Sequence, residues 1–318
     1  MEDMSNLSQV EETAAQGLPE ETLQTKEKKK LYGEHYLAIL AGVLALITLV
    51  LTLFSLPYIL AEPLEEDPEQ IIHDQPPAAV PTIPEVDPQT GEKLPEPEKN
   101  PYGKLDFQYE GRYLGCIKAG TVPGIDVSYY QGQIDWKQVK QSGIDFAIIR
   151  LGYRGFESGK LVEDQYAKTN LKNAKEAGLK IGAYFFSQAL NIKETDQEIQ
   201  FMLKILGDTK LDMPIVLDWE IPANTARTRK MDARTLTDIQ RHFCGQMRDQ
   251  GYQPMIYFNW HQSENLYVLH ELEDYPFWLA LYQDRMTYPW KVEMWQYSDK
   301  GKVPGIQGNV DLNVYMPD

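Results

Sequence analysis

Two carboxylates follow one strongly apolar stretch of the chain and could take part in acid–base chemistry. In the segment PIVLDWE, four apolar residues at 214–217 directly precede Asp218 and Glu220. If the segment is a β-strand, residues i and i+2 point to the same face, so the two carboxylates would project together, about 6.5–7 Å apart along the strand. Such a close pair raises the pKa of one member, which then stays protonated near neutral pH and can act as a general acid. Because an isolated D-x-E is common, the pair gains meaning only from its surroundings.

Other reactive residue types show no comparable arrangement. Cys116 and Cys244 lie far apart, outside any CxxC or Cys/His cluster, so zinc and redox motifs are absent, and whether the two cysteines pair is open. The five histidines lack HExxH spacing, and His242 and His261 are expected at the surface. No convincing Ser/His/Asp set for acyl transfer is visible. We therefore expect neither a metal nor another cofactor.

The elements that must position the two carboxylates are apolar runs separated by amphipathic stretches. Continuous apolar runs are typical of strands buried on both faces, as in parallel sheets. Helical patterns separate the first five runs, and three of these patterns end at a glycine, a common helix stop. The pattern predicts an α/β fold, an irregular TIM-like barrel of five β/α units followed by three strands. The runner-up, an open doubly wound sheet, lacks a glycine-rich phosphate loop after its first strand. The expected strands are 124–128, 145–153, 179–188, 213–220, 253–260, 277–282, 293–298 and 310–315, and the expected helices are 136–143, 166–178, 193–206 and 233–251.

Two further acids lie on the first and the last of the expected strands. Asp126 belongs to GIDVS and Asp311 to VDLNVY. In a closed barrel these strands are neighbours, and active sites form at the carboxyl ends of the strands. Four acids that converge on one barrel mouth fit glycoside hydrolysis, in which carboxylates flank the scissile bond.

Aromatic residues gather toward the same strand ends, where sugar rings stack well on their faces. About half of them are expected to pack in the barrel instead. Arg150, inside an apolar run, is expected to pair with one of these four acids, either as a structural ion pair or in substrate binding. The aromatic residues are Tyr130, Tyr153, Phe186, Tyr257, Trp260, Tyr282, Trp295 and Tyr297.

Several segments together resemble glycoside hydrolase family 25, the Chalaropsis-type lysozymes or N-acetylmuramidases. They are GIDVSYYQGQIDW, DFAIIRLGYRG, LKIGAYFFSQA, PIVLDWE, PMIYFNW and MWQYSDKGKVPGIQGNVDLNVY, in this order over residues 124–315. The resemblance implies hydrolysis of the β-1,4 bond between N-acetylmuramic acid and N-acetylglucosamine, with peptidoglycan glycan strands as the partner. Two rival functions remain open: a non-catalytic glycan-binding protein that kept the barrel, and a glycosidase for another N-acetylated glycan such as chitin.

The resemblance also implies roles for individual residues. Glu220 is similar to the family's general acid, and Asp218 to the carboxylate proposed to assist at the anomeric centre by steadying the substrate's acetamido group. Asp126 and Asp311 match the other two acids of the family's site. Tyr184 and Tyr257 resemble family tyrosines near the reacting sugar. With Tyr153, Trp295 and Arg150 from the strand pattern, these tyrosines form the expected substrate-binding set.

The first hundred residues have a different character. Of the net charge of −16, residues 1–100 carry −13 and residues 101–318 only −3, so the C-terminal part has no basic footprint for nucleic acid. The uncharged apolar stretch 36–60 is long enough to span a bilayer as a helix. Lysines precede it and acidic residues follow it, which predicts a cytoplasmic N-terminus and an extracellular C-terminal part.

The expected organisation is therefore a membrane-tethered protein. The segment after the apolar stretch has nine prolines within residues 62–100 and no apolar periodicity, which predicts an extended stalk. The predicted parts are a disordered cytoplasmic tail (1–35), a transmembrane helix (36–60), a Pro-rich acidic extracellular stalk (61–101) and a glycosidase barrel domain (102–318).

Overall fold

The computed structural model describes residues 35–36, 39–46, 93 and 95–316. The chain divides into two units, residues 1–64 and 65–318, and the second unit contains the predicted barrel. Residues 39–46 are helical, within the stretch expected to span a membrane. The rest of that stretch, apart from Tyr36, and most of the expected stalk lie outside the described residues. Within the described part, no helix is both long and apolar enough to cross a membrane.

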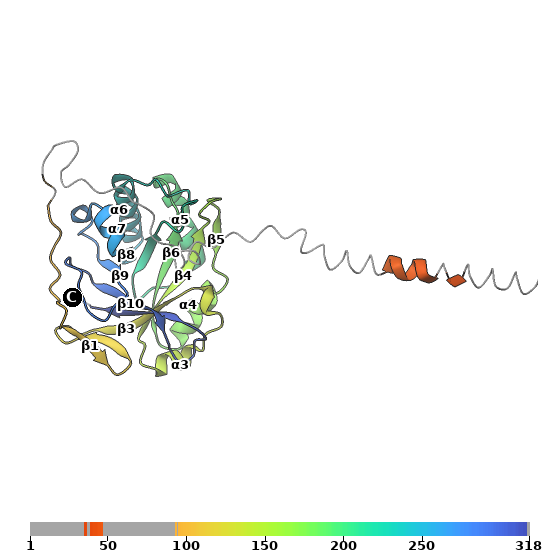
Figure 1. Ribbon diagram of the computed structural model, residues 1–318, viewed down its shortest axis with the longest axis horizontal. Coiled ribbons are helices and arrows are strands. Elements are labelled where there is room, and N and C mark those ends of the chain that lie inside the picture. Colours follow the sequence, from red (N-terminus) through yellow and green to blue (C-terminus); the bar gives the residue numbers. More distant parts are fainter. Residues whose placement is uncertain (1–34, 37–38, 47–92, 94, 317–318) are drawn as a thin grey trace, which may run out of the picture. The chain divides into compact units, whose positions relative to one another are not determined.

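Eight strands form a closed barrel (Figure 1). Their order around it is β3-β11-β10-β9-β8-β7-β6-β4, and β4 pairs back with β3 to close the ring. The predicted eight-stranded barrel is therefore confirmed, and every expected strand is present. The strands are β3 (Val122–Val127), β4 (Phe146–Arg154), β6 (Lys180–Ser187), β7 (Ile215–Trp219), β8 (Pro254–Asn259), β9 (Phe277–Ala280), β10 (Met294–Gly301) and β11 (Val310–Tyr315).

The last strand runs against its neighbours. Strand β11 is antiparallel to both β10 and β3, whereas every other adjacent pair in the ring is parallel. A parallel pairing between consecutive strands needs a crossover of about a dozen residues or more. Only residues 302–309 separate β10 from β11, so the chain turns back directly.

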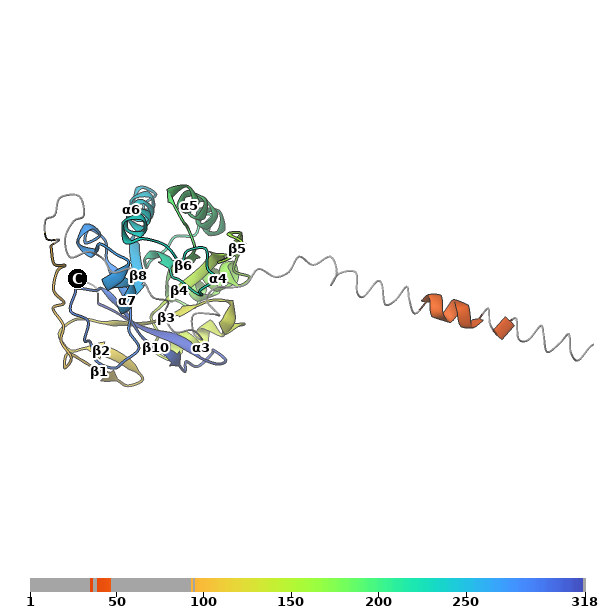
Figure 2. The same cartoon turned by 45° about the horizontal axis from the view of Figure 1, so that its top comes forward.

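Helices lie outside the barrel, along the part that its first five strands form (Figures 1 and 2). An α-helix follows each of the first five barrel strands. No helix lies between β9 and β10 or between β10 and β11. The predicted five β/α units followed by three strands are therefore confirmed. Polar side chains start the two longest helices: Asn191 accepts from the Glu194 N–H, and Asp232 from the Thr235 N–H. The helices are α3 (Trp136–Gln141), α4 (Ala167–Glu176), α5 (Ile192–Leu206), α6 (Ala233–Asp249) and α7 (Trp260–Asn265), with single 3-10 turns η1 (Tyr129–Gln131) and η2 (Leu269–Glu271).

Three features were not expected from the sequence. A short strand β5 (Leu161–Glu163) pairs antiparallel with β4. A hairpin of β1 (Phe107–Glu110) and β2 (Tyr113–Cys116) precedes the barrel. The segment before this hairpin is bound to the loop ahead of β10, because the Asn100 N–H donates to the Pro289 carbonyl and the Lys291 N–H to the Glu98 carbonyl, both at 2.8 Å. The last residues of the expected stalk therefore belong to the barrel domain.

The barrel walls separate two hydrophobic clusters. One fills the barrel, and the other lies outside it, mainly between strands and helices. Alternate residues of each strand supply the two sides, as the pleat requires. The two cysteines, Cys116 and Cys244, are both buried and unpaired. The inner cluster contains Phe146, Ile148, Tyr184, Met213, Val216, Met255, Tyr257, Trp278, Ala280 and Met294.

Strand β4 carries an irregularity that separates its two buried arginines. Its register with β6 shifts between Arg150 and Gly152, and a bulge of this kind reverses which side chains face the core. Beyond the bulge, Arg154 reaches helix α5, where its Nε donates to Glu198 Oε1 at 2.7 Å. Burial raises the pKa of Glu198 from 4.5 to about 7, although Arg154 and Ser187 lower it.

This raised pKa predicts a pH-dependent contribution to stability. Below about pH 7 the folded protein holds a proton on Glu198 that the unfolded chain loses near pH 4.5. The contribution is therefore present in full below pH 4.5 and is lost as the pH rises through about 7, by at most about 3 kcal/mol. Between pH 5 and 8, the wild-type free energy of unfolding should fall relative to that of Glu198→Gln, measured by urea denaturation.

Glu194→Gln is the matched control on the same helix. Burial raises the pKa of Glu194, but hydrogen bonds from Arg227 and the Leu190 N–H bring the net value below normal. Because its pKa is lowered rather than raised, this variant should track the wild type between pH 5 and 8. Parallel pH curves for the wild type and Glu198→Gln would contradict the prediction.

Candidate active site

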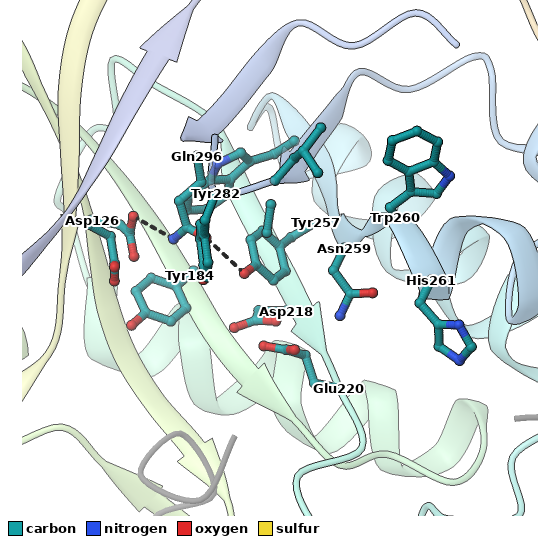
Figure 3. A pocket seen from close by; sticks show the side chains of 14 residues that line it. Asp126, Tyr184, Asp218, Glu220, Tyr257, Asn259, Trp260, His261, Tyr282 and Gln296 are labelled. Atoms are coloured by element: carbon teal, nitrogen blue, oxygen red, sulfur yellow. Dashed lines mark hydrogen bonds between the residues drawn. The ribbon is translucent and has the colours of Figure 1, made fainter. Parts of the chain in front are cut away.

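A cavity of about 330 Å³ opens at the end of the barrel where the parallel strands finish and the antiparallel β11 begins (Figure 3). Residues from β3, β6, β7, β8, β9, β10 and β11 contribute to its wall, together with the loop after β9 and the first turn of α7. The lining residues are Asp126, Tyr184, Asp218, Glu220, Tyr257, Asn259, Trp260, His261, Trp278, Ala280, Leu281, Tyr282, Gln296 and Asp311.

The D-x-E pair reaches the cavity as the strand periodicity predicts. Asp218 is the penultimate residue of β7, and Glu220 directly follows the strand. Both carboxylates lie side by side and face the cavity (Figure 3). Their exposed fractions, 7% and 9%, leave them accessible mainly through the cavity mouth. The structure therefore places both members of the pair at one cavity, and their catalytic role stays a prediction.

The other two acids meet across the seam between the first and the last barrel strand. Asp126 and Asp311 are register partners in the β3–β11 ladder, and both line the cavity. All four expected acids thus share one cavity. Asp126 Oδ2 accepts from Asn313 Nδ2 at 2.7 Å and from Gln296 Nε2 at 2.9 Å. Burial raises the pKa of Asp126, and hydrogen bonds with Asn313, Gln296 and Asp311 lower it only in part.

Neighbouring hydrogen bonds fix the orientation of the two amides at Asp126. Gln296 Oε1 accepts from the hydroxyls of Tyr257 at 3.0 Å and Tyr282 at 3.2 Å, so its NH₂ group turns toward Asp126. In the same way, Asn313 Oδ1 accepts from Trp278 Nε1 at 2.9 Å. The side-chain chemistry permits only one orientation of each amide in this network.

Sequence reasoning missed the amide network, although part of its signal was present. Asn313 lies two residues after Asp311 on the same strand, so the two share a face. Gln296 lies two residues after the inward-facing Met294. The sequence therefore shows that these polar side chains face the barrel interior. It does not show their hydrogen-bond partners, which lie 14–187 residues away in the chain.

The two tyrosines of this network are neutral hydrogen-bond donors. Burial, together with the nearby Tyr282 and the carboxylates of Glu220, Asp218 and Asp126, holds the pKa of Tyr257 well above its ordinary value. Tyr282 is about half exposed, but the desolvation of its hydroxyl and the nearby carboxylates of Asp311 and Glu220 also hold its pKa above the ordinary value. Both phenols therefore keep their protons at physiological pH.

The expected substrate-binding set divides between the cavity and other places. Tyr184 and Tyr257 line the cavity, whereas Tyr153 and Arg150 do not. Arg150 is fully buried and its Nε donates to Asp164 Oδ2 at 2.9 Å, so the predicted ion pair includes an acid outside the four.

The prediction for Trp295 is wrong. It alternates with the inward-facing Met294 and Gln296, so it points out of the barrel, fully buried against Phe107. Its indole N–H donates to the Leu281 carbonyl at 2.8 Å. These contacts exclude Trp295 from the substrate.

The opposite side of the cavity comes from the start of α7 (Figure 3). Asn259 forms a capping box with Gln262, which fixes the helix start. Trp260 packs edge-on against Tyr288, at 5.6 Å between ring centroids. His261 is exposed, as expected, but it also lines the cavity, which its isolated position in the sequence did not indicate.

Within the described chain, no group of three or more His, Cys, Asp or Glu residues is arranged to hold a metal ion.

Comparison with known proteins identifies the family. The model of glycosyl hydrolases family 25 matches residues 125–306, more than half of the chain. The chain belongs to this family. Lysozyme M1 of Streptomyces globisporus is 27% identical over 216 residues, which cover 64% of this chain and 71% of that protein.

Solved structures of the family share the fold. The modular autolysin LytC from Streptococcus pneumoniae, solved in complex with a synthetic peptidoglycan ligand, is 26% identical with a TM-score of 0.53. The match covers 61% of this chain but only 46% of that autolysin. The bacterial lysozyme from Streptomyces coelicolor is also 26% identical, with a TM-score of 0.51, over 61% of this chain and 91% of that one.

The amide network makes a prediction about Asp126. Gln296→Leu removes one donor to the carboxylate and should raise the pKa of Asp126 by about one pH unit or more, because a hydrogen bond to a charged group contributes about 1.5–3 kcal/mol. Carbon-detected NMR of labelled aspartate would follow the carboxyl signal, assigned through its loss in Asp126→Asn.

Tyr282→Phe is the control for this titration. It removes a hydroxyl from Gln296 Oε1 but keeps the amide donor on Asp126. It should therefore shift the pKa of Asp126 much less than Gln296→Leu does. An unchanged or lowered pKa in Gln296→Leu would show that this amide does not stabilise the ionised Asp126.

Proposed function

We propose that this chain hydrolyses the β-1,4 bond between N-acetylmuramic acid and N-acetylglucosamine in peptidoglycan. The observation that carries the proposal is the convergence of Asp218 and Glu220 from β7 with Asp126 and Asp311 from the β3–β11 seam on one cavity. Family membership and the similarity to lysozymes and to an autolysin solved with a peptidoglycan ligand support this substrate.

The proposed roles follow from the chemistry of the bond. Glu220 donates a proton to the leaving glycosidic oxygen, which needs an acid because a sugar alkoxide is a poor leaving group. Asp218 balances the positive charge that develops at the anomeric carbon, directly or by steadying the substrate's acetamido group. Asp126 and Asp311 shape the polar side of the cavity, where the neutral hydroxyl of Tyr257 provides a further hydrogen-bond donor to the network.

Substitutions at the two carboxylates should have different signatures. Glu220→Gln cannot donate the proton, so it should lower kcat about 10²–10⁴-fold, equivalent to about 3–5 kcal/mol at the barrier. A substrate with an activated aryl leaving group needs no protonation and should partly rescue this variant. Asp218→Asn should lose a large factor with both substrates, because its neutral amide cannot balance positive charge at the sugar. Release of reducing ends, with mass analysis of the products, measures the rates.

Three outcomes would revise this assignment. Rescue of Asp218→Asn but not of Glu220→Gln by the activated substrate would mean that the two roles are reversed. Near-normal turnover of both variants would place the reaction elsewhere. Cleavage of chitin oligomers without cleavage of peptidoglycan would replace the proposed substrate.

We also propose that the barrel acts outside the cell, tethered through the apolar stretch 36–60. Support comes from the length of this stretch, from the lysines before it and from the acidic residues after it. An anchor of this kind would place the enzyme beside the wall of a cell whose peptidoglycan lies just outside the membrane. The role we infer is local remodelling of that wall.

Limited proteolysis tests this topology. Protease added to intact wall-less cells should release a soluble barrel fragment that begins within residues 62–97. Cleavage should stop there because the backbone from Glu98 onward is hydrogen-bonded to the barrel. N-terminal sequencing of the fragment locates the cut. A barrel that is degraded only after the membrane is permeabilised would reverse the proposed orientation.

A further inference from the structure

Glu220 lies at a point where the barrel's backbone ladder has ended. The β6–β7 pairing ends at Trp219 and the β7–β8 pairing at Asp218. The peptide group that carries the Glu220 carbonyl therefore lies outside the regular sheet, and a contact other than the strand ladder is needed to fix it. Its position matters because a proton donor must lie within hydrogen-bond reach of the leaving oxygen.

A buried glutamine from the neighbouring strand end supplies this contact. Gln188 directly follows β6, is fully buried, and donates from Nε2 to the Glu220 carbonyl at 2.6 Å. The same nitrogen donates to the Ser187 carbonyl at 2.9 Å. Gln188 is not among the residues that line the cavity, so its effect on the reaction must pass through Glu220.

A threonine fixes the orientation of this amide. Thr228, also fully buried, donates from Oγ1 to Gln188 Oε1 at 2.7 Å. A flipped amide would place its oxygen against two carbonyl oxygens, so only one orientation satisfies all three contacts. Because Thr228 lies on the loop that follows Glu220, Gln188 joins the two ends of the segment 220–228.

Hydrogen bonds to the residues on either side of Gln188 fix the backbone of the turn that carries it. Ser187 Oγ donates to Glu198 Oε2 at 2.6 Å, and the Ala189 N–H donates to Ser187 Oγ at 3.2 Å. On the other side, Trp219 Nε1 donates to the Ala189 carbonyl at 2.9 Å. The backbone on both sides of Gln188 is thus fixed, which leaves its side chain little freedom to move.

We propose that Gln188, with its amide oriented by Thr228, is a positioning residue that holds Glu220 where it can protonate the leaving group. This inference rests on the proposed function. A merely structural glutamine would stabilise the loop equally for every reaction step. A positioning residue affects only the step that uses the Glu220 proton.

The test compares two substrates in variants of the full-length chain. Gln188→Leu should lower kcat on peptidoglycan by up to about 100-fold with little change in KM, since small misplacements of a catalytic group have effects of this size. With a dinitrophenyl glycoside of the same sugar, which needs no proton, the loss should shrink to less than about threefold. In a Glu220→Gln background, Gln188→Leu should cause no further loss on peptidoglycan.

Two controls separate positioning from stability. Gln240 is also a fully buried glutamine, and its Nε2 donates to the Leu217 carbonyl on β7 at 3.1 Å, three residues before Glu220. Gln240→Leu therefore removes the same kind of hydrogen bond as Gln188→Leu. It should lower the melting temperature yet affect both substrates equally. Thr228→Val should reproduce the substrate-dependent loss more weakly, whereas Thr228→Ser, which keeps the hydroxyl, should behave like the wild type. If Gln188→Leu does not fold, the comparison of Thr228→Val with Thr228→Ser still tests the positioning role.

The outcomes distinguish the two proposals. Equal losses on both substrates in Gln188→Leu or Thr228→Val, or losses that add to that of Glu220→Gln, would overturn the positioning role and leave the proposed function intact. A wild-type protein that cleaves neither peptidoglycan nor the aryl glycoside would overturn the proposed function and the positioning role together.

Discussion

Several carboxylates share one end of a barrel whose interior is largely apolar, and the neighbouring polar side chains are arranged so that these carboxylates can remain buried. Removing a carboxylate from water is unfavourable unless hydrogen bonds replace its hydration. For Asp126 this replacement comes from Gln296 and Asn313, each oriented in turn by tyrosine hydroxyls or an indole N–H. These two amides are neutral donors, so they stabilise the carboxylate of Asp126 without adding a positive charge beside it.

The closed barrel brings these groups together at one place. Because β11 runs antiparallel and closes the ring against β3, Asp311 becomes the register partner of Asp126, 185 residues earlier in the chain. On the far side, β7 delivers Asp218 and Glu220 through the simple alternation of a strand. The site thus combines one local pattern with one long-range pairing, and hydrolysis as proposed needs both.

A second polar layer lies behind the site, between the strands and helix α5. Arg154 and Glu198 form a buried ion pair that also binds Ser187, at the end of the strand that leads to Gln188. Buried ion pairs contribute little net stability, because the desolvation of two charges offsets their attraction. Their value here is geometric, since they hold the turn from which Gln188 reaches the Glu220 backbone.

The sequence by itself determined the strands, the first four helices and the positions of the four acids on the strands. Continuous apolar runs, glycine stops and the i, i+2 rule depend only on neighbouring residues, and so the placement of Asp218 and Glu220 could be read directly. The direction of β11, the amide network and the contacts of Gln188 were decided by tertiary structure, because each joins residues far apart in the chain. Trp295 shows the limit most clearly: its aromatic ring suited a sugar, but whether it faced the cavity depended on which side of β10 turned inward. Only the closed barrel settled that, by directing Met294 and Gln296 inward and Trp295 outward.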